Sequence, residues 1–226
     1  VTNMANYAYN DITFITPNTE QDLLNLEFLV TNLSYLFDTT DAYCNTVTHA
    51  ITDTYGTKKF NFDGRDNFNW VSDDIEYIDS MDVWTYDIQI ESAWCPAIDR
   101  FKEWVQSIYP NIDVVGTCEE PGNLVYVNTD VDGNFYTTRY CLELYRSDDE
   151  YSDRYYESLI EVNEILGPIL NIPKDCDYDT LAQKITEYND SDEIIDGVES
   201  ISLNVFDTED GCTFSELAGF IPQPEN

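Results

Sequence analysis

The sequence predicts an α+β fold, with helices packed on one face of an antiparallel sheet. Three observations support this class. Residues 87–122 have the pattern of a strand, a helix and a second strand, and residues 5–37 have that of an earlier strand and helix. Helical periodicity then returns near residue 155. A chain of 226 residues can bury one large core with a smaller one beside it.

The first predicted strand covers residues 5–16, where aromatic and β-branched residues alternate with polar ones, as in a strand that tolerates a sheet edge. Thr19 and Asp22 have the spacing of a helix N-terminal cap. An apolar stripe at helical spacing follows: Leu23, Leu26, Val30, Leu33 and Phe37. Residues 46–55 predict a strand that pairs with the first one, and residues 61–70 an irregular loop or broken strand.

Residues 87–122 organise the prediction. Ile88 and Ile90 alternate with polar neighbours, which is the period of a half-buried strand. Pro96 suits the first turn of a helix, and Pro110 ends that helix. The apolar stripe between them consists of Ile98, Phe101, Val105 and Ile108. A second short strand at residues 112–115 completes the unit.

Asp132-Gly133 lies between two alternating runs within residues 124–145, which predicts a β-hairpin. Asn128, Asp130, Asp132 and Gly133 also match the first half of a calcium-binding loop. The closing position of that loop, where a bidentate Glu is needed, holds Arg139. The hairpin is therefore favoured over calcium, and we predict no metal and no cofactor.

The order strand, helix, strand, strand, helix, strand is that of a ferredoxin-like sandwich, which we expect over residues 1–145. Residues 146–226 form an acidic, mixed helix-and-strand extension. A helix is predicted from Tyr155 to the Gly167-Pro168 pair, another at residues 178–188, and a strand at residues 201–206.

Charge is the outlying property of the chain. Forty-five acidic residues oppose ten basic ones, for a formal net charge of −35, and only five of the basic residues are Lys. Such a charge repels nucleic acid and anionic membranes, so direct binding to either is not expected. A solvated acidic surface that only keeps the protein soluble is the plain alternative for any single charged run.

No catalytic arrangement is evident in the residues. His49 is the single histidine, the six Cys are scattered without C-x-x-C pairs, and the nine Gly form no phosphate-binding loop. We therefore expect a protein that is not an enzyme. The absence of an apolar run of about 18 residues and of a charged-then-apolar leader predicts a cytoplasmic protein with no membrane span.

Several short motifs resemble the YubB-type ferredoxin-like family of phages, plasmids and their bacterial hosts. They are the start ANYAYNDITFIT, the turn YGTKKF, the stretch ESAWCPAIDRFKEWVQSIYP and the turn EEPG. Family motifs would fall on Tyr55, Gly56, Thr57, Lys58, Ala93, Trp94, Cys95, Pro96, Glu120, Pro121 and Gly122. Tyr55 and Cys95 depart from the commonest forms. The resemblance implies a fold and a mobile-element setting in a bacterial host, and no activity.

The leading hypothesis is a non-catalytic acidic protein that binds a basic, nucleic-acid-binding surface of a host protein. It would act as a DNA mimic, and as an inhibitor or trigger of a nuclease or other bacterial defence component. Three acidic patches are candidates: Asp73, Asp74, Glu76, Asp79 and Asp82; Asp148, Asp149, Glu150 and Asp153; and Asp190, Asp192, Glu193 and Asp196.

The alternative is a structural or small-ligand-binding ferredoxin-like protein whose acidity is incidental. A pocket at one end of the sheet would then be lined by the motif residues Tyr55, Gly56, Thr57, Lys58, Trp94, Pro96, Glu120, Pro121 and Gly122. Packing within turns and core is the plain interpretation of these residues, because aromatic side chains at element ends usually pack.

Overall fold

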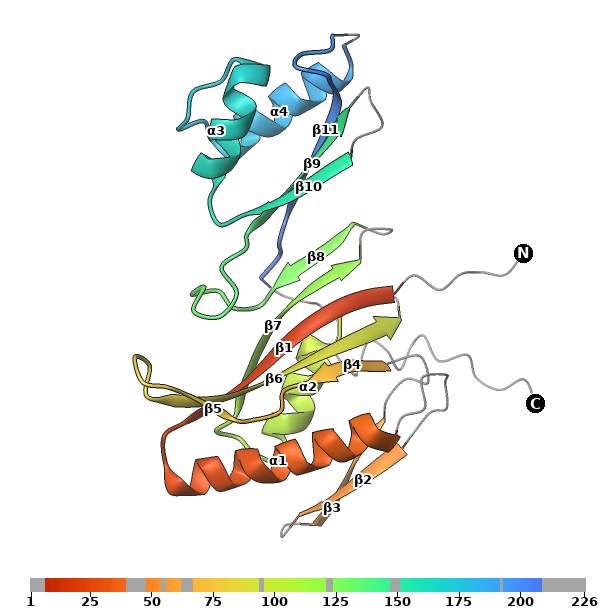
Figure 1. Cartoon of the computed structure of the whole chain (residues 1–226), viewed down its shortest axis with the longest axis vertical. Helices are drawn as coiled ribbons and strands as arrows, with labels where there is room; N and C mark the ends of the chain where they lie inside the picture. The colour runs from red at the N-terminus through yellow and green to blue at the C-terminus, as the bar shows by residue number, and fades with distance from the viewer. Residues whose placement is uncertain are drawn as a thin grey trace, which may run out of the picture. The chain divides into compact units, whose positions relative to one another are not determined.

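A computed structural model describes residues 7–39, 48–53, 56–61, 67–93, 96–120, 124–146, 151–191 and 193–208. The chain divides into two compact units, the first comprising residues up to Val131 and again from Thr208, and the second spanning Asp132–Asp207 (Figure 1). The boundary predicted after residue 145 instead falls inside a strand of the second unit, β9 (Tyr140–Arg146). The mixed α+β class is confirmed, since both units combine antiparallel sheets with helices.

The first unit is built on a six-stranded sheet of order β4-β6-β1-β7-β8, with β5 also paired to β6. Every pairing is antiparallel. The strands are β1 (Tyr7–Pro17), β4 (Asn67–Val71), β5 (Glu76–Ile78), β6 (Val83–Ala93), β7 (Asp113–Glu120) and β8 (Val125–Asn128). The helices are α1 (Glu20–Thr39) and α2 (Ile98–Gln106), which lie on the same side of this sheet in Figure 1.

One core joins both helices to one face of the sheet. Residues with even numbers in β1 point into it, as Ile12 and Phe14 do. The Phe14 ring meets the Phe101 ring of α2 edge to face, with centroids 6.2 Å apart. The other helix contributes Leu26, Leu29 and Leu33. The predicted helices and the strand–helix–strand unit are thus confirmed, and both helices cover the same face.

The predicted cap of α1 is also present. The Thr19 hydroxyl oxygen accepts a hydrogen bond from the backbone N–H of Asp22 at 3.1 Å. The Asp22 carboxylate in turn accepts from the Asn111 side chain at 3.0 Å. The first of these bonds satisfies a backbone donor that the first helical turn leaves without an intrahelical partner, and the second joins the helix to the Asn111 side chain.

The prediction that the strand at residues 46–55 pairs with the first strand is wrong. β1 is a central strand, because β6 and β7 bond to its two edges. Since a strand has only two edges, β2 (Thr48–Asp53) cannot also pair with β1, and it pairs with β3 (Gly56–Asn61) instead. Residues 61–70, predicted as an irregular loop or broken strand, agree with the second alternative: β3 ends at residue 61, and residues 67–71 form β4 on β6 with a register shift between Phe68 and Trp70.

The hairpin predicted at Asp132-Gly133 is also wrong. Gly133 does turn the chain, with a φ of +71°. The strands on either side pair elsewhere: β8 with β7, and β9 with β10 and β11. The Asp-Gly pair therefore lies where the second unit begins, and it is not the turn of a two-stranded hairpin.

The second unit is a three-stranded antiparallel sheet of order β10-β9-β11 with two helices. Its remaining elements are β10 (Tyr151–Tyr156), α3 (Leu159–Leu170), α4 (Tyr178–Asn189) and β11 (Val198–Val205). Leu142 and Leu144 of β9 share a core with Val162 and Leu166 of α3 and Leu181 of α4. The helix predicted at residues 178–188 and the strand predicted at residues 201–206 are confirmed as α4 and β11 in outline.

The helix predicted to begin near Tyr155 and end at Gly167-Pro168 instead begins after Ser158 and continues to Leu170. A proline inside a helix costs about 3 kcal/mol, because it lacks the N–H that bonds the preceding turn. Ile169 and Leu170, which follow the proline, are buried in the second core. Burial of each side chain contributes roughly 1.5–3 kcal/mol, which offsets that cost.

Candidate functional site

The candidate site is the open face of the six-stranded sheet, meaning the face opposite α1 and α2. Odd-numbered residues of β1, β6 and β7 point to it, because successive side chains of a strand alternate between faces. Residues that pair directly across an antiparallel sheet share a face. Tyr9 pairs with Glu91 on one side and Glu119 on the other, and Asp11 pairs with Gln89 and Thr117.

Acidic side chains on this face come from four strands. They are Asp11 of β1, Glu76 of β5, Asp87 and Glu91 of β6, and Glu119 of β7. The six described strands of this sheet contain no Lys and no Arg. The charge of the open face is therefore of one sign across β1, β5, β6 and β7.

Neutral donors hold three of these carboxylates in position. The Gln89 amide donates to Asp11 Oδ1 at 2.8 Å, and the Asn69 amide donates to Glu91 Oε1 at 3.1 Å. The Thr13 hydroxyl donates to Asp87 Oδ1 at 2.5 Å. A neutral donor fixes a carboxylate without cancelling its charge, so the face stays anionic while its side chains are ordered.

The pKa of Asp87 is affected by the other negative charges on this face. Its half-buried position raises the pKa of its carboxyl above the ordinary value, and the hydrogen bond from Thr13 partly opposes that shift. The negative charges of Glu76 and Asp11 raise the pKa further. Like charges brought close together disfavour ionisation, which a cation from another molecule would relieve.

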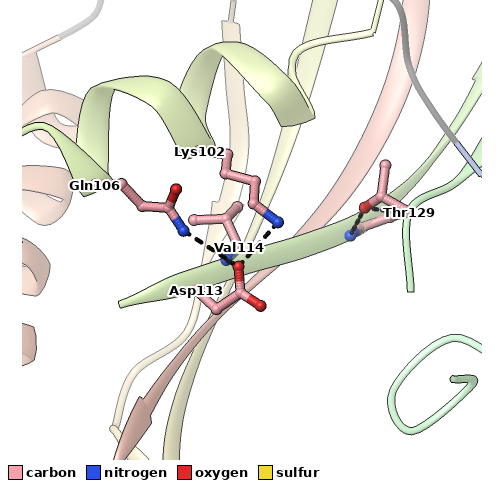
Figure 2. A network of polar contacts seen from close by, with 6 residues as sticks. Lys102, Gln106, Asp113, Val114 and Thr129 are labelled. Carbon is pink, nitrogen blue, oxygen red and sulfur yellow. Dashed lines mark hydrogen bonds and ion pairs between the residues drawn. The ribbon is translucent and has the colours of Figure 1, made fainter. Parts of the chain in front are cut away.

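One further carboxylate, Asp113 at the beginning of β7, pairs with Ile15 of β1 and so belongs to the same set of odd-numbered positions, but it forms an ion pair with α2. Lys102 of α2 places its Nζ 2.9 Å from Asp113 Oδ1, and Gln106 donates to the same oxygen at 3.3 Å (Figure 2). Figure 2 shows both side chains reaching from α2 to this carboxylate. The charge of Asp113 is thus compensated by Lys102, whereas no Lys or Arg among the described residues forms an ion pair with Asp11 or Glu91.

Large aromatic side chains accompany the carboxylates. Tyr7 and Tyr9 lie on the open face of β1 and are 40% and 54% exposed. Trp70 of β4 pairs with Gln89 and is 49% exposed. The open face therefore combines exposed aromatic rings with fixed negative charge.

The first predicted acidic patch lies on and around β5. Its five members, Asp73, Asp74, Glu76, Asp79 and Asp82, are all exposed. Asp82 is already engaged, since its Oδ1 accepts from the Tyr77 hydroxyl at 2.7 Å and from the Asn18 amide at 2.9 Å. These two bonds hold the pKa of Asp82 below its ordinary value. Asp82 therefore fixes a turn, whereas Glu76 belongs to the open face.

The other two predicted patches belong to the second unit. Asp153 is exposed in β10, and Asp148, Asp149, Glu150 and Asp192 lie outside the described residues. Asp190 caps the C-terminus of α4, Glu193 is exposed, and Asp196 has a positive φ of 51°. The Asp196 carbonyl accepts from Arg146 at 2.9 Å. The described members of these patches thus lie within β10, at the end of α4 and in the connection from α4 to β11, and not along one strand or helix.

The predicted motif pocket is only partly described. Tyr55, Trp94, Pro121 and Gly122 lie outside the described residues, as does Cys95. Gly56, Thr57 and Lys58 belong to β3, in a two-stranded sheet with β2, rather than to a turn. Pro96 is buried just before α2, and Glu120 is 2% exposed at the end of β7.

Neither a metal-binding cluster nor a membrane-spanning helix is found among the described residues. The described residues include no group of three or more His, Cys, Asp or Glu able to hold a metal ion. In the calcium-like loop, Asn128 Oδ1 accepts a bond from the backbone N–H of Asp130 at 3.0 Å. In the same described ranges, no helix combines the length and apolar character that crossing a membrane requires.

Comparison of the chain with protein-family models, with curated proteins and with solved structures found no match. The resemblance to the YubB-type family therefore stays a prediction that rests on the short motifs alone.

Sequence reasoning missed the open face because it searched for consecutive acidic residues in connections. The signal was present in the polar half of the alternation. In β6, Asp87, Gln89 and Glu91 occupy every second position between apolar residues. Such spacing puts acidic side chains on one face of a strand, where sequence runs do not reveal them.

Proposed function

We propose that this chain is a non-catalytic acidic protein that binds a basic, nucleic-acid-binding surface of another protein. The open face carries this proposal, because its carboxylates come from four strands that contain no Lys or Arg. Complementary charge speeds association and excludes wrong partners, so a surface of one sign favours a partner of the other. The formal net charge of −35 adds long-range attraction to the same partner.

Mimicry of DNA is the form of binding that the spacing supports. Alternate residues of a strand lie roughly 6.6 Å apart, and residues paired across neighbouring strands about 5 Å apart. Duplex DNA carries one charge per roughly 1.7 Å of its axis, distributed over two strands. A sheet with fixed carboxylates in several rows thus offers a rigid anionic surface to a groove that accepts phosphates.

We also propose that the first unit is ferredoxin-like. β1 and β4 are both antiparallel to β6, which lies between them, and α1 connects them in sequence. β6 and β7 are both antiparallel to β1, which lies between them, and α2 connects them. Two such split βαβ units are what defines a ferredoxin-like sandwich. The YubB-like motifs agree with this fold and suggest a phage or plasmid protein in a bacterial cytoplasm.

In that setting the partner is a host protein that handles DNA, such as a nuclease or another defence component. The acidic protein would inhibit it by occupying its DNA groove, or trigger it by being recognised there. Both roles need the same complementary charge and the same absence of catalysis.

The test is capture of bacterial proteins on the immobilised full chain, with elution by rising salt and, separately, by duplex DNA. Exposed charges are screened over about 8 Å at physiological ionic strength, so the expected partners are basic and leave at moderate salt. Duplex DNA should also displace them. Partners that resist high salt and excess DNA would contradict the mimic and favour a pocket or shape-based contact.

Matched neutral variants identify the surface. Asp11→Asn with Glu91→Gln removes two charges from the open face, whereas Asp73→Asn with Asp74→Asn removes two from the β5 patch. Asp190→Asn with Glu193→Gln is the control in the second unit. We expect the open-face variant to lose most binding, because a rigid groove contacts one surface at a time. Equal small losses in all three variants would indicate only a general charge effect.

A further inference from the structure

The exposed aromatic rings of the open face narrow the chemistry of the partner. Tyr9 and Trp70 are 54% and 49% exposed on the open face, whereas the opposite face of the sheet packs against α1 and α2. Tyr and Trp at an exposed surface are enriched where proteins bind one another, since one rigid ring buries much area at low entropic cost. The aromatic rings are thus an observation separate from the charge.

Carboxylates lie beside one ring and diagonal to the other. Tyr9 lies directly between Glu91 and Glu119 in the register of β6, β1 and β7. Trp70 pairs with Gln89, so Asp87 and Glu91 of β6 are its diagonal neighbours, which is still within reach of a long side chain. Directly opposed residues of an antiparallel sheet have Cβ atoms about 4.5–5.5 Å apart, so one planar cation could contact a ring and a carboxylate together.

We propose that the open face binds an arginine-bearing segment of the partner, with guanidinium groups stacked on Tyr9 and Trp70 and paired with Glu91 and Asp11. This rests on the proposed function and specifies the partner's side chains. A guanidinium is planar, stacks on aromatic rings and bonds a carboxylate through two parallel N–H groups. A lysine ammonium is compact and more strongly hydrated, so it gains less from the same site.

Hydrogen bonds already orient the two carboxylates that would receive such a cation. The Asn69 amide donates to Glu91 Oε1, and the Gln89 amide donates to Asp11 Oδ1. Within the described part of the chain, no Lys or Arg forms an ion pair with Asp11 or Glu91. A guanidinium would therefore neutralise charge that the fold fixes and does not itself compensate.

The test compares an oligo-arginine peptide with an oligo-lysine peptide of equal length, by calorimetry on the full chain at fixed salt. A general charge effect binds both peptides equally. Stacking on each exposed ring is expected to favour arginine by roughly two- to five-fold. The wild-type chain should therefore prefer arginine, with the preference persisting as salt weakens both complexes.

Substitutions then test whether Tyr9 and Trp70 cause the preference for the arginine peptide. Tyr9→Leu and Trp70→Leu should each reduce the arginine preference while leaving lysine binding nearly unchanged, and the double variant should remove it. Tyr178→Leu is the matched control, because Tyr178 is 41% exposed on α4 of the second unit. Glu91→Gln keeps the side-chain shape and should weaken arginine binding even if an aromatic variant proves unstable.

Equal affinity of the wild-type chain for the two peptides would overturn this inference, as would an equal loss in Tyr178→Leu. The proposed function would survive either result if captured bacterial proteins still left with salt and duplex DNA. Conversely, loss of salt and DNA sensitivity in the capture experiment would remove the proposed function whatever the peptides show.

Discussion

The side-chain oxygen of Asn10, in the middle of the sheet, accepts a hydrogen bond from the backbone N–H of Ala97 at 2.8 Å. The Asn10 amide also donates to the carbonyls of Ala8 and Ile90, at 3.0 and 3.1 Å, and to the Ser92 hydroxyl at 2.9 Å. One fully buried side chain thereby joins β1, β6 and the beginning of α2.

Replacing Asn10 with Ala should destabilise the first unit strongly. The change leaves the Ala97 N–H and several oxygens buried without this partner, and each such loss costs about 1–3 kcal/mol. We expect a loss of roughly 2–4 kcal/mol in the free energy of unfolding in urea, after partial relaxation. Asn32→Ala is the control, because Asn32 bonds only the Phe28 carbonyl on the exposed side of α1. Similar losses of unfolding free energy in both variants would show that the buried hydrogen bonds of Asn10 stabilise the unit no more than an exposed one does.

Gly116 of β7 should not tolerate a side chain. A Cβ there would lie 2.4 Å from the backbone oxygen of Asp11 and 3.2 Å from a side-chain carbon of Ile98. Since the first of these is a backbone atom of the neighbouring strand, the sheet itself would have to move. We expect Gly116→Ala to cost about 1–3 kcal/mol, measured by urea unfolding.

Gly167→Ala is the matched control for that substitution. Its Cβ would meet only the Ile172 carbonyl oxygen at 3.2 Å, and Gly167 has a position inside α3. Alanine is favoured over glycine in a helix by up to about 1 kcal/mol, which should offset the close contact. A larger loss in Gly167→Ala than in Gly116→Ala would contradict this view of both sites.

Asp87→Asn should stabilise the chain slightly at neutral pH. Burial and the charges of Glu76 and Asp11 raise the pKa of Asp87 above 3.8, so its ionised form costs free energy in the folded state. That cost is fully present above the folded pKa and disappears as the pH falls through it toward 3.8. The gain should stay within about 1 kcal/mol, because the site is half-buried.

Urea unfolding at neutral pH and near pH 3.8 measures this difference. The advantage of Asp87→Asn over wild type should shrink with acidification. An advantage that grows in acid would have the wrong sign for a raised pKa.

Ser158→Ala should weaken the beginning of α3. The Ser158 hydroxyl accepts from the Glu161 N–H at 3.4 Å, and the Glu161 carboxylate accepts from the Ser158 N–H at 3.2 Å, which together form a capping box. Loss of such a cap costs about 1 kcal/mol. Amide hydrogen exchange should show faster opening of the first turn of α3, while Ser158→Asn keeps a capping side chain and should remain close to wild type.

The sequence predicted elements better than it predicted their partners. Local spacing was enough for α1, α2 and α4, because each buries a stripe with the period of a helix. Strand pairing depends on which edges remain available, and no local pattern reveals that β6 and β7 occupy both edges of β1. The bend at Gly133 was likewise visible, but the partners of its flanking strands were not.

The candidate site divides in the same way. The acidic character of the chain follows from composition, and the exposure of Asp73 and Asp74 from their place in a connection. The grouping of Asp11 with Glu91 requires the register of two strands that are distant in sequence. Asp82 shows the converse, because an exposed acid in a promising run is held by Tyr77 and Asn18.

Each core also carries a sulfur atom. Cys118 is completely buried in the first core, and Cys176 is 7% exposed in the second, where burial raises the pKa of its thiol. A thiol reacts as the thiolate and only where a reagent reaches it, so modification of either cysteine must wait for its core to open. The rate at which a thiol reagent labels each cysteine would report the opening of its own core, and comparison of the two rates would show whether the units unfold together or separately.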